Sequence, residues 1–392
     1  MCASYVIIGD GIAGSSAAET LREADPDADV TVITEEGEAL YNRILIKEFA
    51  KGKLPAAPVS IHDPDWYAER DIDLELDTVV TDVDTDAHEV RTHEGDVHGY
   101  DKLLIATGGT PTRLPVENGD AEGIHHFWTF ENARAIKESA SEAETGVVVG
   151  AGLLGIDLAA ICGAQDVDAH YLMRGNAWWR YALSEEVTAA VDPDGERFEA
   201  DFAGVAIGLN FNTEFIRDTD IETDNGILVD EHMQTNVEDI YAAGDITRFH
   251  DVILGERAQN GAWGSAKEQG SIAGQNMVAD ADADTDAEPA VFEWVSSYSI
   301  THFDFPFLSF GHPTIGDRTV ERKYDDTTWR RVTIRDDRVV GGVLIGDLSA
   351  QSALKKLARR QVDVAGREEL LLEDSIDVEA FQKEEERPAT AE

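Results

Sequence analysis

SYVIIGDGIAG, residues 4–14, is the stretch of sequence that decides the fold. A short apolar strand runs into Gly9, Gly11 and Gly14 and then into a helical pattern. Glycines at this spacing allow a tight turn, a close approach of the backbone to a pyrophosphate and close packing of helix on strand. Glu35 closes the next apolar strand, where an acid accepts hydrogen bonds from a ribose. The stretch therefore predicts a dinucleotide-binding βαβ unit.

The same plan returns in TGVVVGAGLLG, residues 145–155, with Gly150, Gly152 and Gly155 in the places of the first three glycines. The strand that follows ends beside Arg174 instead of an acid. An arginine at this place fits the 2'-phosphate of NADPH, and a plain surface charge is the alternative. A second nucleotide-binding unit is thus predicted, with NADPH favoured over NADH.

The order of the remaining patterns predicts an α/β protein with two Rossmann-like dinucleotide-binding domains followed by a C-terminal α+β domain. Residues 1–111 and 232–285 are assigned to the first domain. The second is expected over residues 112–231 and the C-terminal domain over residues 290–380.

Acidic residues dominate the composition. Asp and Glu number 79 against 32 Lys and Arg, which gives a net charge of −47. The acids are interspersed with an ordinary apolar pattern and are not gathered in one tail. Such a composition resembles that of a halophile's protein, whose surface is rich in acids. Folding and activity are therefore expected to need high ionic strength, which screens the repulsion between the acids. Binding to bare nucleic acid is unfavourable. No apolar run is long enough to span a bilayer and no basic signal region precedes the first strand, so a cytoplasmic location is expected.

Residues 291–360 break the acidic pattern, because they contain 11 Lys and Arg against 9 Asp and Glu. A near-neutral region on so acidic a chain suggests an interface between subunits, as in a homodimer. A docking face for an acidic partner is the alternative, and the basic run from Lys355 to Arg360 fits either.

Cysteine and histidine usage limits the chemistry. Cys2 and Cys162 are far apart and form no CxxC pair, so neither a disulfide framework nor a redox dithiol is expected. The histidines show no spacing typical of a metal site.

Five ordered motifs resemble one family, the FAD and NAD(P)H oxidoreductases of the glutathione-reductase-like superfamily. The resemblance covers about residues 1–280 and is greatest to the branch without a dithiol, the rubredoxin, ferredoxin and nitrite reductases. The motifs are the two glycine fingerprints, LYNRIL at 40–45, LIATG at 104–108 and IYAAGD at 240–245.

The resemblance assigns the first unit to FAD and the second to NAD(P)H. It implies that Thr107 and Gly108 line the FAD site, that Asp245 hydrogen-bonds the ribityl and pyrophosphate region, and that Arg43 contacts FAD. For Arg43 a surface salt bridge is the alternative.

Three catalytic candidates follow from the same resemblance. Lys47 resembles a lysine near the flavin N5 edge but stands one residue earlier, and a solvated helix lysine is the alternative. Trp263 resembles a tryptophan beside the flavin, against a simple core aromatic. Asp157 stands where the family has a glutamate near the nicotinamide, and the shorter acid is equally compatible with helix capping.

The family resemblance predicts hydride transfer from NAD(P)H to FAD and then electron transfer to a ferredoxin-type or rubredoxin-type carrier or a metal-centre enzyme. The interval from Gly155 to Gly208 is short for the family, so the second domain is expected to be shortened. This shortening motivates an alternative, a flavin-bound scaffold without NAD(P)H turnover. A reductase of oxygen or quinones is a further alternative.

Overall fold

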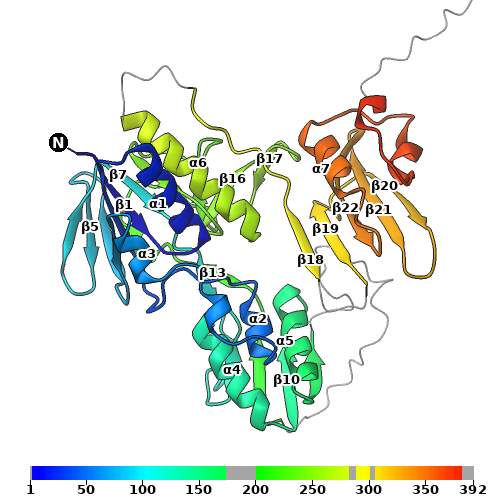
Figure 1. Cartoon of the computed structure of the whole chain (residues 1–392), viewed down its shortest axis with the longest axis horizontal. Coiled ribbons are helices and arrows are strands. Elements are labelled where there is room, and N and C mark those ends of the chain that lie inside the picture. Colours follow the sequence, from blue (N-terminus) through cyan, green and yellow to red (C-terminus); the bar gives the residue numbers. More distant parts are fainter. Residues whose placement is uncertain (1, 174–199, 282–287, 301–304, 382–392) are drawn as a thin grey trace, which may run out of the picture. The chain divides into compact units, whose positions relative to one another are not determined.

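A computed structural model describes residues 2–173, 200–281, 288–300 and 305–381 of the 392-residue chain (Figure 1). The chain divides into two compact units. Of the described residues, the first unit contains those up to His250 together with those from Arg257 to Phe292, and the second contains Asp251–Glu256 and those from Glu293 to Phe381. Each unit is described on its own.

A five-stranded parallel sheet forms the first half of the first unit. Its strand order is β15-β7-β1-β2-β3, with bounds Ile240–Ala242, Lys102–Ile105, Ser4–Ile8, Asp29–Ile33 and Ile72–Glu75. Apart from the edge strand β3, the strands are short and mostly apolar, as expected of a parallel sheet covered by helices. These helices are α1 (Ile12–Ala24), α3 (Pro64–Ala68) and α6 (Trp263–Ala281).

Helices α1 and α6 cross at very short distance. A Cβ atom added to Gly270 of α6 would lie 2.0 Å from the carbonyl oxygen of Ala13 in α1. Only glycine leaves room for this crossing. The pair of helices therefore holds the N-terminal segment and the segment after residue 262 in one domain.

Two small sheets complete this domain. An antiparallel meander is formed by β4 (Val80–Asp84), β5 (Glu89–Thr92) and β6 (Val97–Gly99). A second small sheet has the order β14-β16-β17, with bounds Ile227–Leu228, Thr247–Asp251 and Glu256–Ala258. Short 3-10 helices lie at Ala57–Val59 (η1) and Glu214–Ile216 (η3).

A second parallel sheet lies in the same unit, in the order β11-β10-β12-β9. The strands span Asp168–Leu172, Thr145–Val149, Phe202–Val205 and Ile124–His126. Helices α4 (Phe130–Glu142) and α5 (Leu153–Ala164) pack in one apolar cluster with α2 (Ile46–Ala50). The strand β12 begins at Phe202, two residues into a described range, and pairs with β10, which therefore has a parallel neighbour on each side.

An antiparallel ribbon of β8 (Gly109–Pro111) and β13 (Leu209–Phe211) carries the chain out of the first sheet and back. The predicted end of the second domain, at residue 231, lies beyond this ribbon. The strand β14 pairs with β16 of the first domain. We therefore propose that the second domain ends near β13.

The second unit is built on an antiparallel sheet in the order β18-β19-β22-β21-β20. The strands span Ser297–Ile300, Phe307–Gly311, Arg338–Ile345, Trp329–Arg335 and Arg318–Lys323. Helix α7 (Gln351–Arg359) and the 3-10 helices η4 (Glu368–Leu372) and η5 (Val378–Phe381) join the same apolar core. The predicted fold class, two Rossmann-like domains and a C-terminal α+β domain, is confirmed.

The crossing of α1 and α6 makes a prediction for stability. We expect Gly270→Ala to lower the free energy of unfolding by about 1–3 kcal/mol, because the added methyl group meets backbone that cannot move aside. Gly163→Ala in α5 is the matched control. Gly163 is exposed and a Cβ there meets nothing within 4 Å, so this change is expected to stabilise by up to about 1 kcal/mol. Urea unfolding followed by circular dichroism measures both, and equal effects would contradict the crossing geometry.

Candidate functional site

The first glycine turn is packed so closely that two of its glycines are irreplaceable. Gly9 has a φ of +106°, and a Cβ there would lie 2.4 Å from the carbonyl oxygen of Ala106. A Cβ on Gly14 would lie 1.9 Å from the carbonyl oxygen of Gly9. The middle glycine differs, since a Cβ on Gly11 would meet nothing within 4 Å. The turn therefore packs against backbone at Gly9 and Gly14 and leaves open space beside Gly11.

The second glycine turn repeats this geometry. Gly150 has a φ of +122° and its Cβ would lie 2.0 Å from the carbonyl oxygen of Ala206. A Cβ on Gly155 would lie 2.1 Å from the carbonyl oxygen of Gly150, whereas one on Gly152 would meet nothing within 4 Å. Two segments far apart in sequence therefore build the same open cradle.

Each cradle ends at the start of a long helix. Gly11 is the N-cap residue of α1 and Gly152 that of α5, and neither helix has a side-chain cap or an acid in its first turn. The first N–H groups of the helices therefore remain available, and the helix dipole favours an anion there. Both turns fit the diphosphate of a dinucleotide such as FAD or NAD(P)H.

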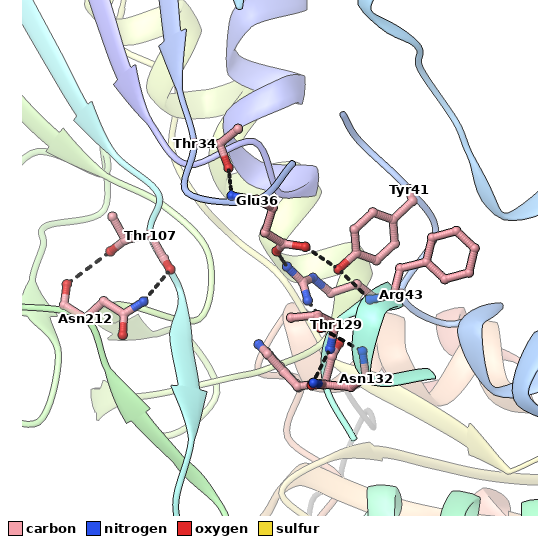
Figure 2. Close-up of polar contacts among 10 residues, drawn as sticks. Thr34, Glu36, Tyr41, Arg43, Thr107, Thr129, Asn132 and Asn212 are labelled. Atoms are coloured by element: carbon pink, nitrogen blue, oxygen red, sulfur yellow. Dashed lines mark hydrogen bonds and ion pairs between the residues drawn. The ribbon is translucent and has the colours of Figure 1, made fainter. Parts of the chain in front are cut away.

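Arg43 lies in a network of polar and aromatic groups (Figure 2). Its guanidinium forms an ion pair with Glu36 and donates to the carbonyl oxygen of Trp128 at 3.0 Å. The guanidinium carbon lies 5.1 Å from the centre of the Tyr41 ring and 5.3 Å from that of Trp128. The Tyr41 hydroxyl donates to Glu36 at 2.7 Å and accepts from the backbone N–H of Phe130 at 3.2 Å.

This network joins the loop after β2 to the start of α4, and thus the two dinucleotide-binding domains. Glu35, the acid predicted to bind the ribose, is exposed, whereas the neighbouring Glu36, which was not predicted as a site residue, pairs with Arg43. Two consecutive acids follow the strand, so the sequence alone could not tell which one meets Arg43.

Asp245 follows β15 and lies within electrostatic reach of Arg43. Burial raises the pKa of its carboxyl to about 6, and the charge of Arg43 partly opposes this shift. The preceding turn is fixed by Gln269, whose side-chain oxygen accepts from the N–H of Gly244 at 2.8 Å and from the Thr247 hydroxyl at 3.0 Å. Arg43 and Asp245, two of the predicted FAD contacts, therefore lie close enough for their charges to interact.

Thr107 and Gly108 lie at the base of the β8/β13 ribbon. The Thr107 hydroxyl donates to the carbonyl oxygen of Asn212 at 3.1 Å, and the Asn212 amide donates to the carbonyl oxygen of Thr107 at 3.3 Å (Figure 2). Gly108 has a φ of +57°, which lets the chain turn into the ribbon. Asn212 was missed by the sequence analysis because its partner lies about a hundred residues earlier.

Two of the three predicted catalytic residues meet. Lys47 Nζ in α2 lies 3.5 Å from Asp157 Oδ1 in α5, and the two side chains are only 13% and 15% exposed. A pair this sheltered is screened less by salt than a surface pair. Trp263 is half-buried at the first residue of α6, on an element separate from this pair. Arg174 lies outside the described residues.

One acid escaped the sequence analysis. Asp10 stands between the first two glycines of the first turn, and its side chain is buried. Any residue type is compatible with this position of the glycine pattern, so spacing gave no signal.

The described parts of the chain contain neither a metal-ligand cluster nor a membrane-spanning helix. No group of three or more His, Cys, Asp or Glu residues there could hold a metal ion. None of the described helices is both long and apolar enough to cross a bilayer.

Comparison with known proteins agrees with this geometry. Residues 3–191 and 179–270 match the sequence profile of the pyridine nucleotide-disulphide oxidoreductases. Residues 299–362 match the C-terminal domain of rubredoxin NAD+ reductases. A NADH-rubredoxin oxidoreductase of Clostridium acetobutylicum is 26% identical over 371 residues, which cover 90% of this chain and 93% of that protein.

A nitrite reductase (NAD(P)H) of Bacillus subtilis is 25% identical over 393 residues, covering 92% of this chain and 48% of that protein. The chain thus spans about half the length of that relative. The reductase in the covalent putidaredoxin reductase–putidaredoxin complex has a TM-score of 0.85 at 23% identity, over 97% of this chain and 98% of that one. That likeness shows the shared fold.

Asp245 predicts an unusual pH dependence of stability. Because its pKa is raised in the folded chain, its contribution to stability is complete below its ordinary pKa of 3.8 and is lost as the pH rises through about 6. We expect Asp245→Asn to raise the free energy of unfolding of the flavin-free chain by about 1–3 kcal/mol at pH 7 and by less at pH 5. Urea unfolding at both pH values measures this. The exposed Asp220→Asn is the control, and a shift that is the same for both variants, or independent of pH, would refute the assignment.

Proposed function

The chain belongs to the pyridine nucleotide-disulphide oxidoreductase family, and we propose that it passes electrons from NAD(P)H through FAD to a one-electron carrier protein of the ferredoxin or rubredoxin type. The observation that carries this proposal is the pair of open glycine turns at Gly11 and Gly152 in one unit. The first turn would hold the FAD diphosphate and the second that of the coenzyme. When bound, FAD supplies the acceptor for a hydride and the donor of single electrons.

The side chains around the first turn support FAD binding. Glu36 and Glu35 are the candidates for the ribose hydroxyls, since both follow β2. Arg43 and Asp245, held by the contacts described above, would face the rest of the cofactor. Thr107 and Gly108 would line it where the chain leaves for the second domain.

We propose that the Lys47–Asp157 pair positions the reacting region between the two domains. Helix α2 comes from the first domain and α5 from the second, so the ion pair fixes one against the other. The lysine is displaced by one residue from the family pattern and the acid is shorter by one methylene, yet the two still meet.

The thiols support an external electron acceptor. Cys162 is buried and Cys2 is exposed, and both are free. Burial raises the pKa of the Cys162 thiol to about 11, which keeps it protonated and unreactive. Since no dithiol is available to receive the electrons within the chain, a separate carrier is the simplest acceptor.

The names of similar proteins support a carrier of the rubredoxin or ferredoxin type. The C-terminal profile is that of rubredoxin NAD+ reductases, one relative is named for rubredoxin, and one structural neighbour was solved with putidaredoxin. The near-neutral residues 291–360 would then form a docking face for an acidic carrier, or a contact between two copies of the chain.

An anaerobic titration with matched variants tests this function. In the wild type, NADH or NADPH should bleach the flavin absorbance, and the tighter coenzyme tests the preference predicted from Arg174. Both Gly11 and Gly152 have extended backbone angles that alanine adopts. Gly11→Ala should therefore fold yet weaken FAD binding tenfold or more, on the order of 1.4 kcal/mol. Gly152→Ala should keep its flavin and raise the coenzyme concentration needed for bleaching by a similar factor.

The behaviour of the wild type in this titration distinguishes the rival functions. Retained flavin that neither coenzyme bleaches in the wild type would rule out the reductase and support a flavin-bound scaffold. Bleaching followed by rapid reoxidation by oxygen or quinones, with no transfer to rubredoxin or ferredoxin, would support a small-molecule reductase.

We also propose that the protein acts in the cytoplasm of a halophile. The net charge of −47 supports this, because self-repulsion weakens as salt shortens the screening length from about 10 Å at 0.1 M to about 3 Å at 1 M. The midpoint of thermal unfolding should rise when sodium chloride is increased from 0.1 to 2 M. A midpoint that is unchanged or lower would contradict a halophilic origin.

A further inference from the structure

Asp10 is a buried acid whose hydrogen bonding is incomplete. Its residue is 7% exposed. The Tyr67 hydroxyl donates to Oδ1 at 2.6 Å, and the Ser15 hydroxyl lies 3.1 Å from that of Tyr67. The other oxygen, Oδ2, is buried and has no hydrogen-bond partner. A carboxylate left in this state carries an uncompensated desolvation cost.

The charged and titratable groups that face Asp10 do not supply a cation. Helix α3 contributes Tyr67, the loop after β2 contributes Glu36, and α1 contributes the uncharged Ser15. Burial raises the pKa of Asp10 to about 7; the hydrogen bond from the Tyr67 hydroxyl opposes the shift, and the charge of Glu36 adds to it. Burial likewise raises the pKa of Tyr67, further above its usual range, so the phenol keeps its proton.

Asp10 lies in the glycine turn that would receive the FAD diphosphate. It separates Gly9, which packs on the neighbouring strand, from Gly11, which faces open space at the start of α1. The diphosphate of FAD, which carries two negative charges, would approach the turn here. An ionised carboxylate in the same turn opposes that approach, and burial from water leaves the repulsion poorly screened.

We propose that Asp10 is a further FAD-binding residue that acts as an uncharged acid, so that the chain takes up one proton at Asp10 when FAD enters the first glycine turn. This inference rests on the proposed assignment of FAD to that turn. In this proposal Asp10 differs from Arg43 and Asp245, because it favours FAD binding by being uncharged.

The charge of FAD fixes the direction in which its binding and the protonation of Asp10 affect each other. FAD favours the protonated form, so the bound cofactor raises the proton affinity of Asp10, and by reciprocity the proton raises the affinity for FAD. Affinity is therefore greatest well below pH 7 and declines as the pH rises through 7. Above pH 7 the other acid proposed to bind FAD, Asp245, with a pKa of about 6, is already ionised and adds little to the pH dependence of the affinity.

The test is the dissociation constant of FAD measured on the flavin-free full chain by fluorescence quenching, in molar salt, from pH 6.5 to 8.5. In the wild type it should rise about five- to tenfold between pH 7.5 and 8.5. Asp10→Asn keeps the shape and the acceptor for Tyr67 but cannot ionise, so its dissociation constant should change less than twofold. Asp27→Asn, an exposed acid in the turn after α1, should behave like the wild type.

Calorimetry keeps the inference testable even if the Asp10 variant fails to fold. Titration of FAD into the wild type in two buffers of different ionisation enthalpy should show uptake of up to about 0.9 proton per FAD at pH 8. No proton uptake, or the same pH profile in wild type and Asp10→Asn, overturns the role of Asp10 while leaving FAD binding intact. Absence of FAD binding at every pH overturns the proposed function as well.

Discussion

The contact between a helix and the turn that precedes it is the constraint on which this structure depends. At Gly14 a Cβ would lie 1.9 Å from the carbonyl oxygen of Gly9, and at Gly155 one would lie 2.1 Å from that of Gly150. With no side chain in the way, the first turn of each helix packs directly on the end of its strand. The middle residue is then turned outward, so the two open cradles are a consequence of packing and need no further device.

A second set of contacts holds the two cradles in one unit. Arg43, Glu36 and Tyr41 come from the loop after β2, while their partners Trp128 and Phe130 stand at the start of α4. The β8/β13 ribbon, closed by Thr107 and Asn212, makes the other connection. The segments that would contact FAD are thus the same segments that join the domains. We therefore expect occupancy of the first cradle by FAD to affect the placement of the second.

Local patterns in the sequence predicted the parts of the fold that depend on local rules. The glycine fingerprints follow from backbone sterics, and the strands from short apolar runs, so both could be read from neighbouring residues. The Lys47–Asp157 pair could be suggested only by resemblance, because the two residues come from different domains. Asn212 and Glu36 were missed for a related reason. Their roles depend on partners distant in sequence, or on which of two adjacent acids faces inward.

The charge of the chain raises a physical question: a protein with a net charge of −47 binds cofactors that are themselves anions. Both cradles meet this difficulty with dipoles. The uncapped N–H groups of α1 and α5 attract a phosphate at short range, and neither helix has an acid in its own first turn. At high salt the distant surface acids are screened, since their fields fall off within a few ångströms, whereas hydrogen bonds inside the turn are not. What remains unscreened is any charge within the turn itself. Asp10 is the acid there, so a chain that tolerates dozens of surface carboxylates is expected to be sensitive to the protonation of this one.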